Sequence, residues 1–301
     1  MRGGRLSAAL LRFRMAIVKQ KAYAKINLTL EVLGIEAGYH ALDSLVVSVD
    51  LFDQITIKTR KDEKITVKMR GMDSENIPET QNNAYKAAKL FQEKYAVQGV
   101  DILIDKNIPM GAGLGGSSAD VGGVLNGLAE LYKIEDEKGL DEIAAALGSD
   151  TVYMRKGGLA RMQGRGTRVY YFGMDKPLYF LLICPTEGVS TKACFDKFDA
   201  LGRAGGTGAT SRAIDAYVKG DMEALGKNLY NDLFAPARQL NTKIQAAYEE
   251  AESFAPLGVT MTGAGSCVVA LFENETFCQY AKSRYRGDGL CLIAKTVAEC
   301  K

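Results

Sequence analysis

The chain has 301 residues, of which 47% are hydrophobic and 25% are charged, with 38 basic residues against 36 acidic ones. This composition is typical of a globular protein long enough for two domains, and no basic stripe indicates nucleic acid as a main partner. No apolar run approaches the roughly 18 residues that a membrane-spanning helix needs, so we expect no membrane association.

Cysteine and histidine usage excludes further classes. The six cysteines all lie in the second half of the chain without CxxC spacing, and His40 is the only histidine. A zinc site is therefore disfavoured. Reduced, buried thiols in a cytoplasmic protein are the simpler interpretation.

The first 14 residues are unusual. They hold four arginines and no acidic residue. The pattern superficially suits a transit peptide, but a non-native or upstream-start extension is the simpler interpretation, with Met15 beginning the fold. We therefore expect residues 1–14 to be a disordered extension and leave them out of the fold.

The first predicted strand lies within residues 21–34, where apolar side chains alternate with polar ones. Lys25 and Asn27 share its polar face. They are either solvated or point together at a ligand. Tyr39 and His40 follow in a polar loop, and such a pair could hold a flat ring. From these residues alone, an incidental pair on the surface is the simpler interpretation.

Further elements follow in chain order. Strands are expected at residues 44–50, 54–59, 64–69 and 100–104, with helices at 82–95 and 139–147. The second of these helices ends at Gly148, and Asp150 follows shortly after it. A carboxylate gains nothing from the dipole at a helix C-terminus. Asp150 is therefore a candidate for a role beyond local stability, with a simple turn residue as the alternative.

The second half begins with an apolar strand at residues 178–184. The later pattern predicts helices near 211–219, 222–229, 242–254 and 276–285, and strands at 259–262, 267–272 and 291–297. Helices on one side of a short antiparallel sheet would give an α+β fold. We expect one domain over residues 15–172 and another over residues 173–301.

The most informative stretch is PMGAGLGGSSAD, residues 109–120. It follows a strand and opens a helical pattern, with Ser117 and Asp120 as an approximate capping box. Glycines let backbone approach an anion, and the unpaired N–H groups of a helix N-terminus favour phosphate. A flexible turn is the alternative. No lysine precedes the serines, so an ordinary P-loop is disfavoured, and the preceding region does not fit a dinucleotide fold.

This loop resembles the phosphate-binding motif of the GHMP small-molecule kinases. Other motifs of the chain are similar, in the same order, to those of the 4-diphosphocytidyl-2-C-methyl-D-erythritol kinase family: AYAKINLTLEVLG, AGYHAL, NNAYKAAKLF, LGSDTVYM, GVSTKACF, NDLFAPAR and MTGAGSCVVALF. The resemblance implies an N-terminal domain similar to ribosomal protein S5 domain 2, a ferredoxin-like C-terminal domain, and an active site between them.

The resemblance also implies the reaction. ATP would phosphorylate the 2-hydroxyl of a cytidine diphosphate sugar alcohol in non-mevalonate isoprenoid biosynthesis, with Mg²⁺ accompanying ATP. Asp150 would take the hydroxyl proton, and Lys25 would orient it and offset charge on the moving phosphoryl group. Such a transfer needs positioning and charge stabilisation more than covalent chemistry. Metal ligands and oligomeric state stay open, with a monomer or weak homodimer expected.

Binding residues follow from the same resemblance. Those implied for ATP are Asn83, Lys106, Pro109, Gly111, Gly113, Gly115, Gly116, Ser117 and Ser118. Those implied for the substrate are Asn27, Tyr39, His40, Phe195, Thr262 and Gly263, with the cytosine between Tyr39 and Phe195.

Two positions depart from the family pattern: Thr151–Val152 replaces Val-Pro, and Ala84 replaces a larger apolar residue. Neither removes a reacting group, although the loop that holds Asp150 could sit differently. The competing interpretations are a sibling kinase for mevalonate or homoserine, and a catalytically silent nucleotide-binding regulator.

Overall fold

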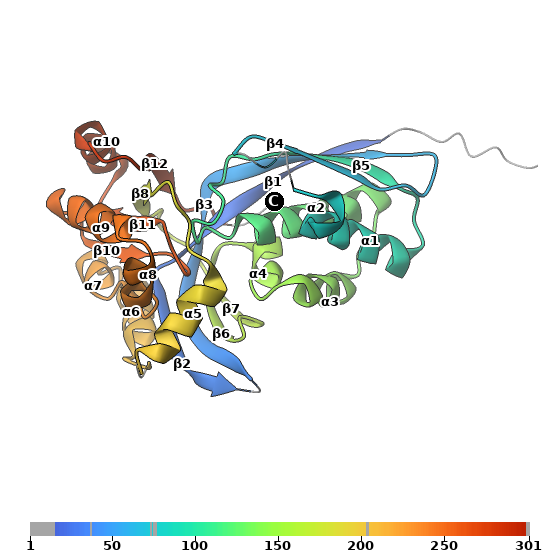
Figure 1. Ribbon diagram of the computed structural model, residues 1–301. Helices are drawn as coiled ribbons and strands as arrows, with labels where there is room; N and C mark the ends of the chain where they lie inside the picture. Colours follow the sequence, from blue (N-terminus) through green and yellow to red (C-terminus); the bar gives the residue numbers. More distant parts are fainter. Residues whose placement is uncertain (1–15, 37, 73, 75–76, 203–204, 299–301) are drawn as a thin grey trace, which may run out of the picture.

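The computed structural model describes residues 16–36, 38–72, 74, 77–202 and 205–298. The expected extension at residues 1–14 lies outside these residues. Two β-sheets organise the described chain, and the long strand β3 (Tyr39–Thr59) belongs to the first of them (Figure 1).

β3 is the centre of the first sheet because its long, largely buried run pairs with four other strands. The other strands of this sheet are β1 (Ile17–Asn27), β2 (Thr29–Glu36), β4 (Thr66–Arg70), β5 (Val100–Asp105), β6 (Leu159–Gly164), β7 (Arg168–Phe172) and β9 (Tyr230–Asn231). β9 comes from late in the chain and pairs in parallel with β2. A late segment is thereby built into the first sheet.

One face of this sheet is covered by helices (Figure 1). They are α1 (Asn83–Tyr95), α2 (Gly116–Tyr132), α3 (Glu137–Leu147) and α4 (Thr151–Lys156), with the 3-10 turn η1 (Glu79–Gln81) before them. α2 packs directly on β1 and β3. Its glycines allow the close approach, since a Cβ on Gly123 would lie 2.6 Å from Ile55 and one on Gly127 would lie 2.7 Å from Ile57.

The second sheet has the strand order β10-β11-β8-β12 and is antiparallel throughout. Its elements are β8 (Tyr179–Cys184), α9 (Lys243–Ser253), β10 (Gly258–Met261), β11 (Val268–Phe272), α10 (Glu275–Arg284) and β12 (Leu290–Lys295). This β-α-β-β-α-β order is ferredoxin-like, as expected. Inserted after β8 are α5 (Thr191–Ala200), α6 (Ala209–Lys219), α7 (Met222–Lys227) and α8 (Phe234–Leu240).

The side chains of β8 alternate between two hydrophobic cores. Phe180 and Leu182 join the core that contains β1, β3 and α2, whereas Leu181 and Ile183 join the core under α9 and α10. The second sheet is therefore packed on both faces, which holds it against the first half of the chain. The boundary at residues 172 and 173 stays a prediction.

Some local expectations were wrong. The strand expected over residues 21–34 is two strands, and the strands expected at 44–50 and 54–59 are one. The N-cap of α2 is Gly115 with φ of 74°, so Ser117 and Asp120 form no capping box. Asp120 instead turns inward, where a tertiary partner replaces the local cap.

Candidate active site

A cavity of about 420 Å³ opens between the two halves of the chain. Its lining residues come from β1, the glycine loop, the start of α4, α5 and the turn after β10, and they include Lys25, Asp150, Phe195 and Gly263. Most of the residues that the sequence singled out for chemistry thus meet at one place, although they are far apart in the chain.

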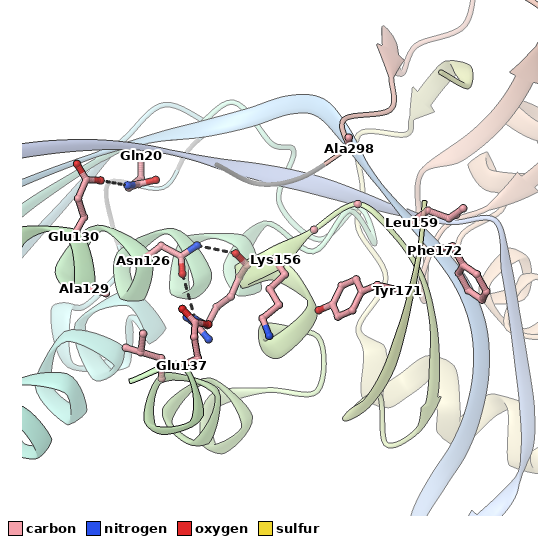
Figure 2. A pocket seen from close by; sticks show the side chains of 14 residues that line it. Gln20, Asn126, Ala129, Glu130, Glu137, Lys156, Leu159, Tyr171, Phe172 and Ala298 are labelled. Carbon is pink, nitrogen blue, oxygen red and sulfur yellow. Dashed lines mark hydrogen bonds and ion pairs between the residues drawn. The ribbon is translucent and has the colours of Figure 1, made fainter. Parts of the chain in front are cut away.

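A larger cavity, of about 600 Å³, lies elsewhere (Figure 2). It is bordered by α2, α3 and the C-terminal end of α4, with Glu130, Glu137 and Lys156 among its lining residues. It contains neither the glycine loop nor any residue predicted for the site, and its guanidinium group, Arg155, is already paired with Glu137 and Asp141. Size alone therefore does not mark the functional site.

Lys25 and Asp150 form the reactive-looking pair of the first cavity. The Lys25 ammonium lies 3.6 Å from Asp150 Oδ2, with side chains that are 5% and 36% exposed. Of the two alternatives left open for Lys25, the solvated one does not hold, because both faces of β1 are covered at this point. The lysine is buried and immobilised, while the carboxylate keeps access to the cavity.

Two neighbouring contacts position this pair. The Lys25 N–H donates to the Leu114 carbonyl (3.0 Å), which ties β1 to the glycine loop. Asp150 occupies the N-cap position of α4, a helix that the sequence did not predict, but it makes no side-chain capping bond. Thr151 Oγ1 donates to the Gly148 carbonyl (2.6 Å) and to the Ala144 carbonyl. The threonine that departs from the family pattern thus fixes the turn that carries Asp150.

Asn27 connects the two halves of the chain. Its Oδ1 accepts from the Lys25 ammonium and from the Gly263 N–H (3.0 Å), while its own N–H donates to Thr262 Oγ1 (3.0 Å). Its Nδ2 donates to Ser44 Oγ (2.8 Å). Asn27, Thr262 and Gly263 therefore lie together, joined by hydrogen bonds to one another; their roles in substrate binding stay a prediction.

Sequence reasoning missed two members of this arrangement. Ser44 Oγ accepts a hydrogen bond from Asn27 Nδ2. Asn231 Nδ2, on β9, donates to the Gly263 carbonyl (2.9 Å) and to the Met261 carbonyl. Asn231 opens the NDLFAPAR motif, so the motif was noticed but no role was attached to it. The signal was a polar residue inside a motif; its Oδ1 caps the Leu233 N–H (2.8 Å), which leaves the amide nitrogen free to reach the end of β10 and the turn after it.

The glycine loop has the conformation that its composition predicts. Gly111, Gly113 and Gly115 have φ of 66°, 77° and 74°, the left-handed region that favours glycine. A Cβ on Gly113 would lie 2.1 Å from the Thr262 carbonyl oxygen. The loop therefore packs against the second glycine turn, which only a residue without a side chain permits.

A third cavity, of about 240 Å³, lies along the outer side of this loop. It is lined by the loop, by the start of α2, and by Asn83, Lys106 and Asp120. Asn83 Nδ2 donates to Ser117 Oγ (3.2 Å) at the N-terminus of α2. This end of the helix has unpaired N–H groups and partial positive charge, which suit a phosphate. Pro109, Gly111 and Gly116 also line it, while Ser118 borders the first cavity.

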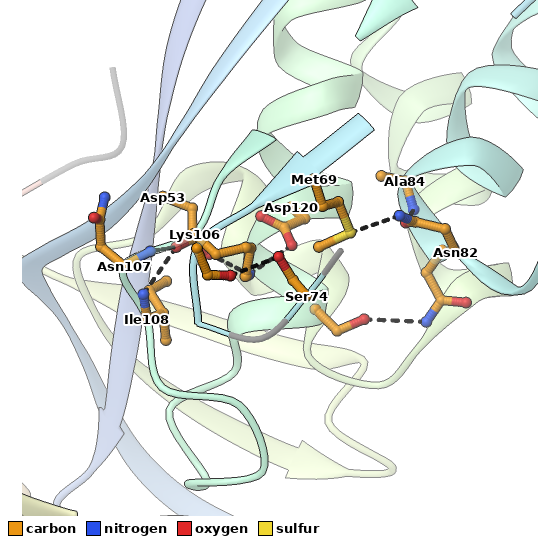
Figure 3. A network of polar contacts seen from close by, with 12 residues as sticks. Asp53, Met69, Ser74, Asn82, Ala84, Lys106, Asn107, Ile108 and Asp120 are labelled. Atoms are coloured by element: carbon orange, nitrogen blue, oxygen red, sulfur yellow. Dashed lines mark hydrogen bonds and ion pairs between the residues drawn. The ribbon is translucent and has the colours of Figure 1, made fainter. Parts of the chain in front are cut away.

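Lys106 is engaged in an ionic cluster rather than free (Figure 3). Its ammonium contacts Asp53 and lies 2.7 Å from Asp120 Oδ2. Burial raises the pKa of Asp120 to about 7, although the neighbouring Lys106 charge opposes the shift. Asp53 and Asp120 were not recognised as partners from the sequence, because Asp53 lies 53 positions away from the lysine.

The aromatic residues are arranged differently from the expected sandwich. His40 stacks on Phe195, with ring centroids 4.6 Å apart and an interplanar angle of 26°, and its Nε2 lies 2.8 Å from Asp199 Oδ1. Tyr39 is 52% exposed, and the Arg165 guanidinium lies 3.6 Å from its ring centroid. Phe195 lines the first cavity, whereas Tyr39 does not. A cytosine between the two rings stays a prediction.

Membrane-spanning helices and metal-binding clusters are both absent from the described part of the chain. None of its helices is long and apolar enough to cross a membrane. Within the same residues, no group of three or more histidine, cysteine, aspartate or glutamate side chains is arranged to hold a metal ion. The thiols of Cys184, Cys194, Cys267, Cys278 and Cys291 are free.

Comparison with known proteins gives consistent results. The family model for the GHMP kinases N terminal domain matches residues 82–160, and that for GHMP kinases C terminal matches residues 213–276. A 4-diphosphocytidyl-2-C-methyl-D-erythritol kinase of Clostridium tetani is 34% identical, covering 93% of this chain and all of the relative. One of Caldicellulosiruptor bescii is 36% identical, covering 86% of this chain and 90% of the relative.

Solved structures agree with these relatives. A crystal structure of 4-(cytidine 5'-diphospho)-2C-methyl-D-erythritol kinase has a TM-score of 0.75 at 26% identity, covering 92% of this chain and 98% of the other. A homoserine kinase from Cytophaga hutchinsonii has a TM-score of 0.73 at 16% identity, covering 95% and 96%, which reflects the shared fold. The chain therefore belongs to the 4-diphosphocytidyl-2-C-methyl-D-erythritol kinase family of the GHMP kinases.

Proposed function

We propose that the protein is an ATP-dependent kinase that phosphorylates the 2-hydroxyl of 4-diphosphocytidyl-2-C-methyl-D-erythritol, in non-mevalonate isoprenoid precursor biosynthesis. The observation that carries the proposal is the Lys25–Asp150 pair, 3.6 Å apart, in a cavity bordered by the glycine loop. An ammonium, a carboxylate and a phosphate-binding helix terminus are the parts that phosphoryl transfer to an alcohol requires.

Asp150 is the base in this mechanism. Its carboxylate is partly exposed to the cavity and has no side-chain capping bond. One carboxylate oxygen is therefore available to accept the proton of the substrate hydroxyl, while the hydroxyl oxygen attacks the γ-phosphorus and ADP leaves. The Lys25 ammonium lies 3.6 Å from Asp150 Oδ2 and helps to hold this carboxylate in place. The same ammonium offsets negative charge on the phosphoryl oxygens in the transition state.

The phosphates of ATP lie along the glycine loop in this proposal, at the N-terminus of α2. Asn83, Ser117 and Ser118 supply polar groups beside the loop. The oxygens of Asn83, Ser117 and Ser118 beside the loop would suit Mg²⁺ bound with ATP, which would supply neutralisation of the phosphate charge. We further propose a cytoplasmic protein that acts as a monomer or weak homodimer.

The decisive experiment is a coupled ADP-release assay with three acceptors: 4-diphosphocytidyl-2-C-methyl-D-erythritol, mevalonate and homoserine. We expect kcat/KM to be highest, by at least about 100-fold, for the acceptor that carries a cytosine, because aromatic and polar side chains can recognise that ring. Faster turnover of mevalonate or homoserine would assign the chain to a sibling activity. ADP release with none of the acceptors would favour a silent nucleotide-binding regulator.

Recognition of the base is tested at Phe195, which lines the cavity. Phe195→Ala should raise KM for the cytidine substrate about tenfold, the loss of roughly one stacking contact, and leave KM for ATP unchanged. Tyr39→Ala should have a comparable effect if the base lies between the two rings. Tyr170→Ala removes a ring that is also about half exposed but lies outside the cavity, and serves as the control. Equal rises in both KM values would contradict the assignment.

A further inference from the structure

The glycine loop is anchored by a buried ionic cluster that we call the loop clamp, consisting of Asp53, Lys106 and Asp120 (Figure 3). Asp53 belongs to β3, Lys106 follows β5, and Asp120 is the fifth residue of α2. Their side chains are 0%, 3% and 5% exposed. Three charged groups from separate segments are thus removed from water together.

Asp53 holds backbone as well as charge. Its Oδ1 accepts the N–H of Asn107 (2.6 Å) and the N–H of Ile108 (2.8 Å), while its Oδ2 contacts the Lys106 ammonium. The two amides immediately precede the loop over residues 109–115, and Asp120 follows it. One lysine therefore connects the segment that enters the loop with the helix that leaves it.

Stability alone gives no reason for this cluster. Buried ion pairs are costly to desolvate, and apolar residues of similar volume would often serve the core as well. The clamp also holds two carboxylates against one ammonium, which leaves a carboxylate only partly compensated. A geometric role accounts for its presence, because charge-assisted hydrogen bonds restrict backbone position more tightly than apolar contacts do.

The clamp borders the cavity of about 240 Å³, where ATP is proposed to lie, on one side only. Lys106 and Asp120 line that cavity, whereas Asp53 is fully buried behind them. Asp120 Oδ1 is buried and has no hydrogen-bond partner among the described residues. The ideal Cβ position of Gly116 lies only 3.4 Å from the Lys106 nitrogen, so the loop closes directly over the ammonium.

We infer that Asp53, Lys106 and Asp120 are positioning residues that set the shape of the glycine loop and, through it, the affinity for the donor nucleotide. Asp53 acts without touching the nucleotide. The inference rests on the proposed function only in taking ATP as the ligand. It assigns to Lys106 a role through the backbone, in place of the direct contact that the sequence resemblance implies.

Asp53→Asn is the decisive variant, because it removes a charge that lies behind the cavity. ATP binding is measured by titration calorimetry without an acceptor. We expect the Kd for ATP to rise about tenfold for Asp53→Asn and by a similar factor for Lys106→Met. The double variant should bind no more weakly than Lys106→Met alone, since residues that act as one unit are not additive. Amide hydrogen exchange over residues 107–116 should accelerate in each variant.

Glu31→Gln is the matched control. Glu31 is also a buried acid, and its carboxylate accepts hydrogen bonds from Thr207 Oγ1 (2.9 Å) and from the N–H groups of Gly208 (2.7 Å) and Thr210 (2.9 Å), away from the loop. This variant should lower the melting temperature and leave the Kd for ATP unchanged. If Asp53→Asn does not fold, the equally isosteric Asp120→Asn replaces it, with hydrogen exchange over residues 107–116 as the deciding readout, because Asp120 itself lines the cavity.

The outcomes separate the two proposals. A folded Asp53→Asn variant that binds ATP within twofold of the wild type overturns the clamp. So does weaker binding in Lys106→Met alone, which would make the lysine a direct ligand. If the wild-type protein binds no ATP, the proposed function fails, and hydrogen exchange over residues 107–116 still decides the clamp: unchanged rates in Asp53→Asn overturn it.

Discussion

Two lysine–aspartate groups border the glycine loop, and they are built in opposite ways. In the first, the Lys25 ammonium lies 3.6 Å from an Asp150 carboxylate that is 36% exposed. In the second, Lys106 is enclosed by Asp53 and Asp120, with no member more than 5% exposed. The ammonium–carboxylate contact is long and partly exposed at Lys25 and Asp150, and short and buried at Lys106.

Accessibility and hydrogen bonding distinguish a reacting group from a positioning group here. A base needs an oxygen that can reach a substrate, and Asp150 borders the cavity with no capping bond. A positioning residue needs its atoms occupied by protein, as those of Asp53 are by Lys106, Asn107 and Ile108. Residue type alone does not separate the two roles, but accessibility and unused hydrogen-bonding capacity do.

The largest effect is expected at the open pair. Asp150→Asn should leave ATP binding nearly intact and lower kcat at least about 100-fold, since a general base contributes on this order. Asp141→Asn, which alters an aspartate of α3 that pairs with Arg155, is the control and should keep its activity. Full activity in Asp150→Asn would remove this residue from the mechanism and, with it, the contrast between the two groups.

Lys25→Met tests the same contrast from the side of the cation. We expect kcat to fall by roughly 10- to 100-fold, because charge on the transferred phosphoryl group loses a partner. The Kd for ATP should change little, whereas Lys106→Met should change mainly the Kd. Steady-state kinetics and calorimetry on both variants check this separation. If Lys25→Met and Lys106→Met changed kcat and the Kd for ATP in the same proportion, the two lysines would not differ in role.

The next effect concerns the loop between the two groups. A Cβ on Gly115 would lie 3.0 Å from Lys25 and 3.2 Å from Met154, at a φ of 74° that β-branched residues avoid. Gly115→Val should therefore weaken ATP binding about tenfold or more. Gly220→Val is the matched control, since Gly220 has a φ of 71° and open space around its Cβ position. Equal ATP affinities in the two variants would contradict a phosphate-binding role for the loop.

The smallest effect is on stability, and it belongs to the closed group. Burial raises the pKa of Asp120 from 3.8 to about 7. The folded protein therefore holds a proton that the unfolded chain has released, so this residue makes the free energy of unfolding fall as pH rises from about 4 to about 7. Asp120→Asn removes that contribution.

The melting temperature of Asp120→Asn, taken relative to the wild type, should thus increase between pH 5 and pH 8 by a few degrees. Thermal unfolding at several pH values in that range measures the difference. A difference that stays constant with pH would show that Asp120 does not titrate in this range.

Much of the local structure could be predicted. The alternation in β1 and the helical pattern after residue 116 follow from short-range periodicity and turn residues, whereas the ferredoxin-like order of the second half was implied by the family resemblance. α4 was missed because six residues are too few to show a periodic pattern. The capping box was wrong because Asp120 has a stronger partner in Lys106 than the local backbone offers.

The features that could be read from the residues are therefore local: glycines that permit the left-handed loop and a helix terminus after it, together with a family resemblance that pairs Lys25 with Asp150. Tertiary structure alone decided that Asn27 joins Thr262 across 235 positions, that Lys106 is enclosed by carboxylates, and that His40 rather than Tyr39 lies on Phe195. Backbone conformation is set by neighbours within a few residues. The partner of a buried polar group is set by whichever distant segment the packing of both cores brings beside it.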